Sequence, residues 1–292
     1  METKEHIPGF AIAALVALLL TPWIVYAAPV PAALPACSAM VSVDWISGTI
    51  RAQAELDLAA AGIRLPSGRA EAEQVLESAI PGLVRGTALA IDLDSYRTVA
   101  DSIDDGTLQT EALETFLESG RRLDLALSRD LGTLVATYAW KLADLASLYV
   151  RHSSPIDMPA ADRYLPTRSY TGIIIFVQGI YTVQGEHRTA TLSPCLFPRL
   201  FDESMKALLE RNLQAPGLLR TWGSVAYAAG LDDPVITARA GGDPLRIMAT
   251  RLFGSLRTDI VISSGDALKI LGSPDNRALI QAGRVVFVID EP

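Results

Sequence analysis

A long stretch near the N-terminus carries no charge, and this stretch determines where the remainder of the chain can fold. After Glu5, no Asp, Glu, Lys or Arg occurs until Asp44. Within that stretch, residues 7–26 (IPGFAIAALVALLLTPWIVY) are apolar without interruption. About 20 apolar residues are enough to cross a bilayer as a helix. We therefore predict that residues 1–40 form a membrane-targeting segment, and that the rest of the chain works outside the cytoplasm.

The apolar run is followed by small residues and prolines, which end in Leu34-Pro35-Ala36-Cys37. Three kinds of processing remain open. Signal peptidase cuts after a small pair such as Val25-x-Ala27, the segment stays as an uncleaved anchor, or Leu34–Cys37 is a lipobox and Cys37 becomes a lipid-bearing N-terminus. Pro35 is unusual within a lipobox, so Cys37 is a candidate for lipidation rather than an assignment. An oxidising periplasm would also permit a disulfide between Cys37 and Cys195.

Composition excludes several classes of function. The net charge is −8 and the pI is about 5.0, whereas binding to nucleic acid or to an anionic lipid surface requires a basic face. The chain has only two cysteines, too few for a disulfide-rich scaffold, a four-cysteine zinc site or an iron–sulfur cluster. A chain of 292 residues is long enough for two ordinary domains.

The pattern of residues 41–150 predicts an α+β module. Ser47-Gly48 separates two apolar runs and indicates a β-hairpin. A helix is expected after Pro66-Ser67, stopped or kinked at Pro81-Gly82, and a strand is expected over 88–93. A second helix carries its apolar stripe between 108 and 117. Alternation over 122–128 and 133–142 predicts a second hairpin.

A second α+β module is predicted over residues 170–292, after a linker at 151–169 that is rich in Pro, Ser and Asp. Residues 171–177 are apolar enough for a strand at the centre of a sheet, and 222–228, 245–253 and 284–290 are further strands. A helix is expected over 205–213, capped by Asp202. Two more helices are expected to begin at Ser263 and at Ser273-Pro274. Each module is thus predicted to contain an antiparallel or mixed sheet with packed helices.

No catalytic constellation is evident, and we predict no catalytic residue, cofactor or metal ligand. His152 and His187 stand alone, without a second ligand nearby. The acidic pairs Asp104-Asp105 and Asp232-Asp233 adjoin Gly or Pro, which is typical of turn residues. Cys195 lies between two prolines in an apolar run, so buried packing is favoured over a reactive thiol.

Four arginines give the second module a basic stripe: Arg239, Arg246, Arg251 and Arg257. Of these, Arg239, Arg246 and Arg251 are weak candidates for a surface site. Because Arg246 and Arg251 differ by an odd number, they would face opposite sides of one regular strand. Surface arginines that pair with nearby carboxylates are the alternative.

Both modules resemble bacterial envelope proteins, in particular the small outer-membrane lipoproteins related to the N-terminal domain of flagellar-assembly protein T. The resemblance is carried by Asp44-Trp45, by the turn 47–50, and by the alanine- and arginine-containing helix after Leu65-Pro66. In the second module it is carried by 170–175, 192–203, 223–227, 239–245 and 258–263. In those envelope proteins, an Asp-Gly-Arg turn follows the second strand that contains a proline. In this chain, residues 204–209 (SMKALL) stand in the place of that turn. The resemblance implies an envelope-associated structural or assembly role, with the flagellum as one setting.

These observations favour a non-enzymatic, membrane-tethered protein on the periplasmic side of the envelope. Its expected partners are other envelope or motility proteins, and an oligomer is compatible with the sequence. An envelope enzyme that acts on the cell wall or on a small ligand is one alternative, and a peptidoglycan-binding module is another.

Overall fold

The computed structural model describes residues 36–161 and 166–290. The apolar stretch at 7–26 lies outside this range, as does most of the predicted targeting segment. Among the described residues, no helix is both long and apolar enough to span a membrane.

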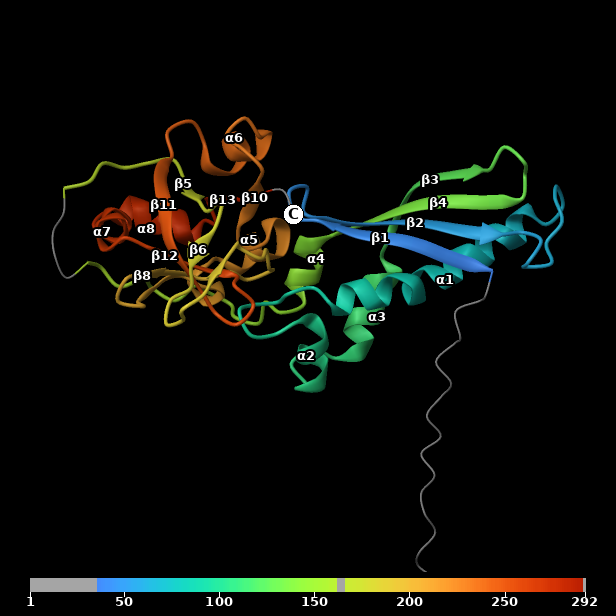
Figure 1. The fold of residues 1–292 in the computed structure, drawn as a ribbon, viewed down its shortest axis with the longest axis horizontal. Helices are drawn as coiled ribbons and strands as arrows, with labels where there is room; N and C mark the ends of the chain where they lie inside the picture. The colour runs from blue at the N-terminus through green and yellow to red at the C-terminus, as the bar shows by residue number, and fades with distance from the viewer. Residues whose placement is uncertain (1–35, 162–165, 291–292) are drawn as a thin grey trace, which may run out of the picture. The chain divides into compact units, whose positions relative to one another are not determined.

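The N-terminal domain contains a four-stranded antiparallel sheet in the order β1-β2-β4-β3 (Figure 1). Its strands are β1 (Cys37–Asp44), β2 (Thr49–Asp57), β3 (Arg121–Leu127) and β4 (Thr133–Lys141). Buried and exposed residues alternate along β2, as expected of a sheet with one solvated face. The two predicted hairpins are confirmed, with β1 pairing β2 and β3 pairing β4.

Helices cover the buried face of this sheet. They are α1 (Arg69–Leu89), α2 (Val99–Asp104), α3 (Thr110–Glu118) and α4 (Leu142–Ser147). The helix α1 runs through Pro81, so of the two expected effects of Pro81-Gly82, a stop or a kink, the stop is wrong. The predicted strand over 88–93 is also wrong. Its first residues complete α1, and the rest forms a turn closed by a single bridge between Asp92 and Thr98.

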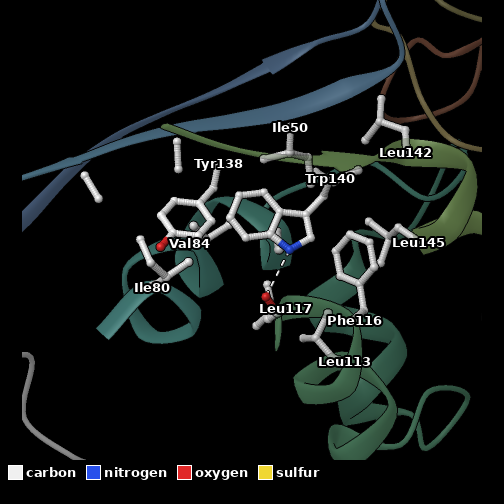
Figure 2. Close-up of a cluster of buried hydrophobic side chains, with 14 of the residues drawn as sticks. Ile50, Ile80, Val84, Leu113, Phe116, Leu117, Tyr138, Trp140, Leu142 and Leu145 are labelled. Atoms are coloured by element: carbon white, nitrogen blue, oxygen red, sulfur yellow. Dashed lines mark hydrogen bonds between the residues drawn. The ribbon is translucent and has the colours of Figure 1, made fainter. Parts of the chain in front are cut away.

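The core of the N-terminal domain is centred on the indole of Trp140 (Figure 2). The ring is stacked beside Tyr138 at a centroid distance of 6.2 Å, and its Nε1–H donates to the Leu117 carbonyl at 3.0 Å. A Cβ on Gly120 would lie 2.3 Å from the indole ring. A residue without a side chain is therefore required where the chain leaves α3, since the ring fills the space.

The C-terminal domain contains a mixed seven-stranded sheet in the order β10-β13-β5-β11-β12-β8-β9. Its strands are β5 (Ile173–Phe176), β8 (Leu200–Asp202), β9 (Ala207–Leu209), β10 (Ala226–Ala228), β11 (Leu245–Phe253), β12 (Asp259–Ile262) and β13 (Val285–Val288). A small hairpin pairs β6 (Tyr181–Thr182) with β7 (Thr189–Ala190). The central strand β5 is parallel to both neighbours and nearly all of it is buried, as its apolar run predicted.

The helices of this domain are the short η1 (Arg211–Leu213), α5 (Pro216–Trp222), α6 (Pro234–Ala240), α7 (Ser264–Leu271) and α8 (Pro274–Gln281). The starts of α7 and α8 agree with prediction, and the Ser263 side chain caps α7 by accepting from the Asp266 N–H. The expected helix over 205–213 is wrong. The Asp202 carboxylate accepts from the backbone N–H groups of Ser204 and Lys206, which closes a turn between β8 and β9.

The fold class is therefore α+β, with two sheet-containing domains, as predicted. The described residues between α4 and β5 contain no helix or strand. Even so, this segment is attached to the C-terminal domain, because Met158 is buried in its core and the Ile156 N–H donates to the Asn212 carbonyl at 2.8 Å.

Candidate interaction surface and the domain junction

The outer edge of β1 is a long strand edge with little charge along it, and α1 packs against the same strand. Its sequence, CSAMVSVD, contains no Lys, Arg, Pro or Gly, and its only charged residue is Asp44 at the end. Within the described chain, β1 pairs only with β2, in an unbroken register from Cys37 to Asp44. Such an edge offers a row of backbone N–H and C=O groups to another strand.

The opposite edge, β3, differs in each respect. It carries the charges of Arg121, Arg122 and Asp124, and its register with β4 shifts between Arg122 and Asp124. Leu123 is the extra residue at this bulge. Charges and bulges are the devices by which natural sheets prevent edge-to-edge pairing. One edge of the sheet is thus blocked, while the other is open.

Side chains on β1 also alternate in a way that suits an added strand. Ala39, Val41 and Val43 pack against the core, whereas Met40 projects from the other face and is 80% exposed. An exposed methionine at an edge is adaptable and apolar. The edge therefore combines free backbone groups with an apolar contact.

The junction between the two domains is built around the turn that contains Ser95. The Leu256 N–H donates to the Ser95 carbonyl at 3.0 Å, and nearby the Phe197 N–H donates to the Leu93 carbonyl at 2.9 Å. Gly254 has a φ of +90°, and a Cβ at this position would lie 2.4 Å from the Ser95 Cβ. Backbone hydrogen bonds and close approach make residues of both domains part of one compact unit.

An ion pair in which the carboxylate is buried lies behind this turn. The Arg199 guanidinium lies 2.8 Å from the Asp259 carboxylate, and Ser95 Oγ lies 3.2 Å from Thr258 Oγ1 and accepts from Arg199 at 3.3 Å. Burial raises the pKa of Asp259, and the hydrogen bonds and charge of Ser95 and Arg199 oppose this without cancelling it. The network joins a serine of one domain to an arginine and an aspartate of the other.

Aromatic contacts complete the junction on the side of the β1–β2 turn. Trp45, part of the Asp-Trp pair that carries the resemblance, packs edge-to-face on Tyr227 at 5.7 Å. The Tyr227 hydroxyl accepts from the Cys195 N–H at 3.0 Å and donates to the Cys195 carbonyl at 2.9 Å. Trp45 of this motif thus connects the two domains.

Both cysteines are free and buried. Burial raises the pKa of the Cys195 thiol well above its ordinary value, which agrees with a packing role and opposes nucleophilic reactivity. The candidate Cys37 begins β1, and its side chain belongs to the N-terminal core. The preceding Ala36 carbonyl accepts from the Asp57 N–H at 2.9 Å.

Arg239 is not a surface residue, contrary to its selection as a surface-site candidate. It is 6% exposed, and its guanidinium donates to four backbone carbonyls, those of Gly283, Trp222, Gly223 and Ser224. Burial lowers the pKa of Arg239 to about 10, so it remains charged at neutral pH. Its position on α6 turns the side chain inward, where it satisfies carbonyls that water cannot reach.

The other members of the basic stripe do not converge. Arg246 and Arg251 are both exposed, because the register of β11 shifts between Ala249 and Arg251 and the extra residue cancels their odd spacing. The expectation that they face opposite sides is therefore wrong. Arg251 donates to Gln184 at 2.6 Å, and Arg257 pairs with Glu186 at 2.9 Å.

The acidic pairs are turn and cap residues, as predicted. Asp233 caps α6 by accepting from the Val235 N–H at 2.9 Å, and Asp105 accepts from the Thr107 N–H at 2.8 Å. The ring of His152 lies 2.9 Å from the Gln214 carbonyl. In the part of the chain that the structure describes, no group of three or more His, Cys, Asp or Glu side chains is placed to hold a metal ion.

Sequence reasoning missed a different group of arginines. Arg97, Arg199 and Arg211 line one hollow at the junction, although they lie in segments far apart in the chain. No local pattern indicates this convergence, because it depends on how the two domains pack.

Comparison with known proteins agrees with this division into domains. Residues 36–148 match the family model of the N-terminal domain of Treponema pallidum Tp0624, and residues 172–291 match the model of its second domain. The chain belongs to the Tp0624 family. The first match begins one residue before β1 and the second one residue before β5, so each Tp0624 domain contains one of the two sheets. No curated protein matches the chain.

Proposed function

We propose that this protein is a non-enzymatic, membrane-tethered interaction protein of the bacterial envelope, and that it binds an extended segment of another envelope protein along β1. The observation that carries the proposal is the contrast between the open edge β1 and the blocked edge β3. Motility components are among the partners that the resemblance suggests.

Strand addition accounts for the features of β1. A peptide that adds to a sheet edge gains main-chain hydrogen bonds, and alternate side chains supply specificity. With eight residues in unbroken register, β1 offers a long edge. Met40, on the solvated face, would contact the side chains of the added strand.

Charge favours a different protein over a second copy as the partner. The net charge is −8, so two copies repel each other at low ionic strength. Near the edge, Asp44 on β1 and Glu55 opposite Ser38 are acidic, and Arg51 opposite Ser42 offsets one of these charges. A basic extended segment is therefore the expected partner.

The position of β1 also bears on the tether. The strand β1 begins at Cys37, the candidate residue for lipidation. A cut before Cys37 would remove the Ala36 carbonyl that accepts from Asp57, and a lipid would have to be attached to a thiol that is packed in the core. This geometry favours an uncleaved anchor, or a cut upstream of Ala36, over lipidation at Cys37.

The proposal is tested with two matched variants expressed in native cells. Met40→Lys places a charge on the open edge, and Leu123→Lys makes the same kind of change on the blocked edge, where Leu123 is 50% exposed. Co-purification of envelope proteins with the full chain should be lost in Met40→Lys and kept in Leu123→Lys. Equal retention by both variants, or turnover of a defined substrate by the purified protein, would contradict the proposal.

A further inference from the structure

A hollow of about 270 Å³ lies at the domain junction and is lined by charged and aromatic side chains. Asp94, Tyr96 and Arg97 line it from the N-terminal domain, and the C-terminal domain supplies Phe197, Arg199, Glu210, Arg211 and Asn212. The hollow therefore exists only when both domains are in place. Its location is separate from β1, so the inference below stands independently of the proposed function.

Two of the three arginines in this hollow already have anionic partners. Arg97 lies 2.8 Å from the Asp94 carboxylate and 3.3 Å from that of Asp105. Arg199 is held by Asp259, and its guanidinium carbon lies 5.5 Å from the centroid of the Tyr96 ring. These pairs hold the side chains that form the walls of the hollow.

Arg211 differs from the other two. Its side chain makes no hydrogen bond or ion pair with any residue that the structure describes, and its guanidinium lies 5.0 Å from the centroid of the Phe197 ring. It is half-buried, on the short helix η1 that begins directly after β9. A guanidinium has five N–H donors, and a partly buried one without an anionic partner has donors available to a ligand.

The charges around Arg211 are of both signs. Burial lowers the pKa of Arg211, repulsion from Arg97 adds to this, and the attraction of Asp94 is weaker. Arg151 repels it as well, while Glu210 acts in the opposite direction. Glu210 forms no ion pair with Arg211 or with another described residue, so an anion would bind beside it at some electrostatic cost.

We propose that this hollow binds the oxyanion of a small acid, a carboxylate or a phosphate, through the guanidinium of Arg211. The planar fork of Arg211 matches the two oxygens of either group. The rings of Phe197 and Tyr96 offer apolar contact to the body of the ligand. Because both domains contribute, a bound acid would also strengthen their junction.

Isothermal titration of the full chain in non-ionic detergent tests the proposal, with acetate and inorganic phosphate as separate probes. The wild-type chain should bind at least one of them with a dissociation constant of about 1 mM or lower, and the probe that binds identifies the chemistry. Arg211→Gln should weaken binding about tenfold or more, since a charge-assisted bidentate contact is lost. Arg246→Gln removes an equivalent exposed charge elsewhere, and it should bind as the wild type does.

Misfolding would also explain a loss of binding by Arg211→Gln. A variant of the same hollow that gains affinity excludes this explanation for the site. Glu210→Gln removes the opposing carboxylate and should tighten binding several-fold. In the unmodified protein, the bound probe should protect Arg211, but not Arg246, from an arginine-specific reagent such as phenylglyoxal, with the modified sites located by mass spectrometry. Absence of binding to both probes by the wild type would overturn the proposal, as would equal binding by wild type, Arg211→Gln and Glu210→Gln.

Discussion

Arg199 and Asp259 form an ion pair at 2.8 Å in which only one partner is sealed from water. The Asp259 side chain is 0% exposed, whereas that of Arg199 is 30% exposed and reaches the hollow at the domain junction. The Arg199 backbone N–H also donates to the same carboxylate at 3.0 Å. The buried charge of Asp259 therefore depends on one arginine that also borders the N-terminal domain.

Arg199→Gln is expected to destabilise the protein by about 3 kcal/mol at neutral pH, because it leaves a buried carboxylate without its counter-charge. The pKa of Asp259 is already raised by burial, and losing Arg199 raises it further. An acid whose pKa is raised by folding destabilises the native state above its folded pKa and no longer does so below its unfolded pKa.

The stability deficit of Arg199→Gln should thus grow as the pH rises above about 4, the pKa of an unfolded aspartate. Urea unfolding of the wild type and the variant across this range measures the deficit. A deficit that stays constant with pH would mean that the Asp259 charge is not the cause. Arg246→Gln serves as the control, and its stability should match that of the wild type at each pH.

Gly254→Ala tests the close approach of the two domains. Gly254 and Gly179 have nearly equal φ angles, +90° and +91°. A Cβ at Gly254 would meet Ser95 at 2.4 Å, whereas nothing lies within 4 Å of a Cβ at Gly179. Gly179→Ala therefore reports the cost of the backbone conformation alone, about 1–2 kcal/mol.

Gly254→Ala should cost a further 1–3 kcal/mol or so, because the added methyl group forces the Ser95 turn away. Thermal unfolding of the two variants gives the difference directly. If both alanine variants lose the same stability, then Ser95 and Gly254 are not in contact, and the junction described here is wrong.

Arg239→Lys is expected to lower the free energy of unfolding by at least about 2 kcal/mol. A lysine ammonium lacks the planar fork that serves four carbonyls, so buried acceptors are left unsatisfied. Arg246→Lys, the same change at an exposed position, should cost less than about 0.5 kcal/mol. Chemical denaturation compares the two, and equal losses would indicate that the carbonyl contacts of Arg239 contribute nothing.

Much of the fold could be predicted because its signals are local. The turn at Ser47-Gly48, the cap at Ser263 and the apolar run of β5 each identify an element by chemistry within a few residues. The failures have a physical cause as well. Met205, Leu208, Leu209 and Leu213 have helical spacing, but Met205 adopts a φ of +62° in the turn after β8. The apolar residues that follow are then drawn into β9 and η1 by the sheet and its core.

The candidate sites could be predicted only in part. The sequence of β1 shows that the strand has few charges. That β1 lies at the edge of the sheet follows from the strand order, and the sequence of one segment does not reveal this order. The charge of Arg239 predicts a surface residue. Its burial depends instead on carbonyls that are distant in the sequence, those of Gly283 and Trp222, to which its guanidinium donates. Arg97, Arg199 and Arg211 come together only through the packing of two domains.

Crosslinking at Met40 is the direct test of whether β1 receives a strand from another envelope protein. A photoreactive amino acid is placed at Met40 in cells that express the full chain, and a second strain carries it at Leu123 on the blocked edge. We expect a discrete adduct from position 40, mapped by mass spectrometry to one extended, basic segment of another envelope protein, and no such adduct from position 123. Equal labelling from both positions, an adduct formed only with a second copy of the chain, or the absence of any adduct at position 40 would show that β1 does not receive such a strand.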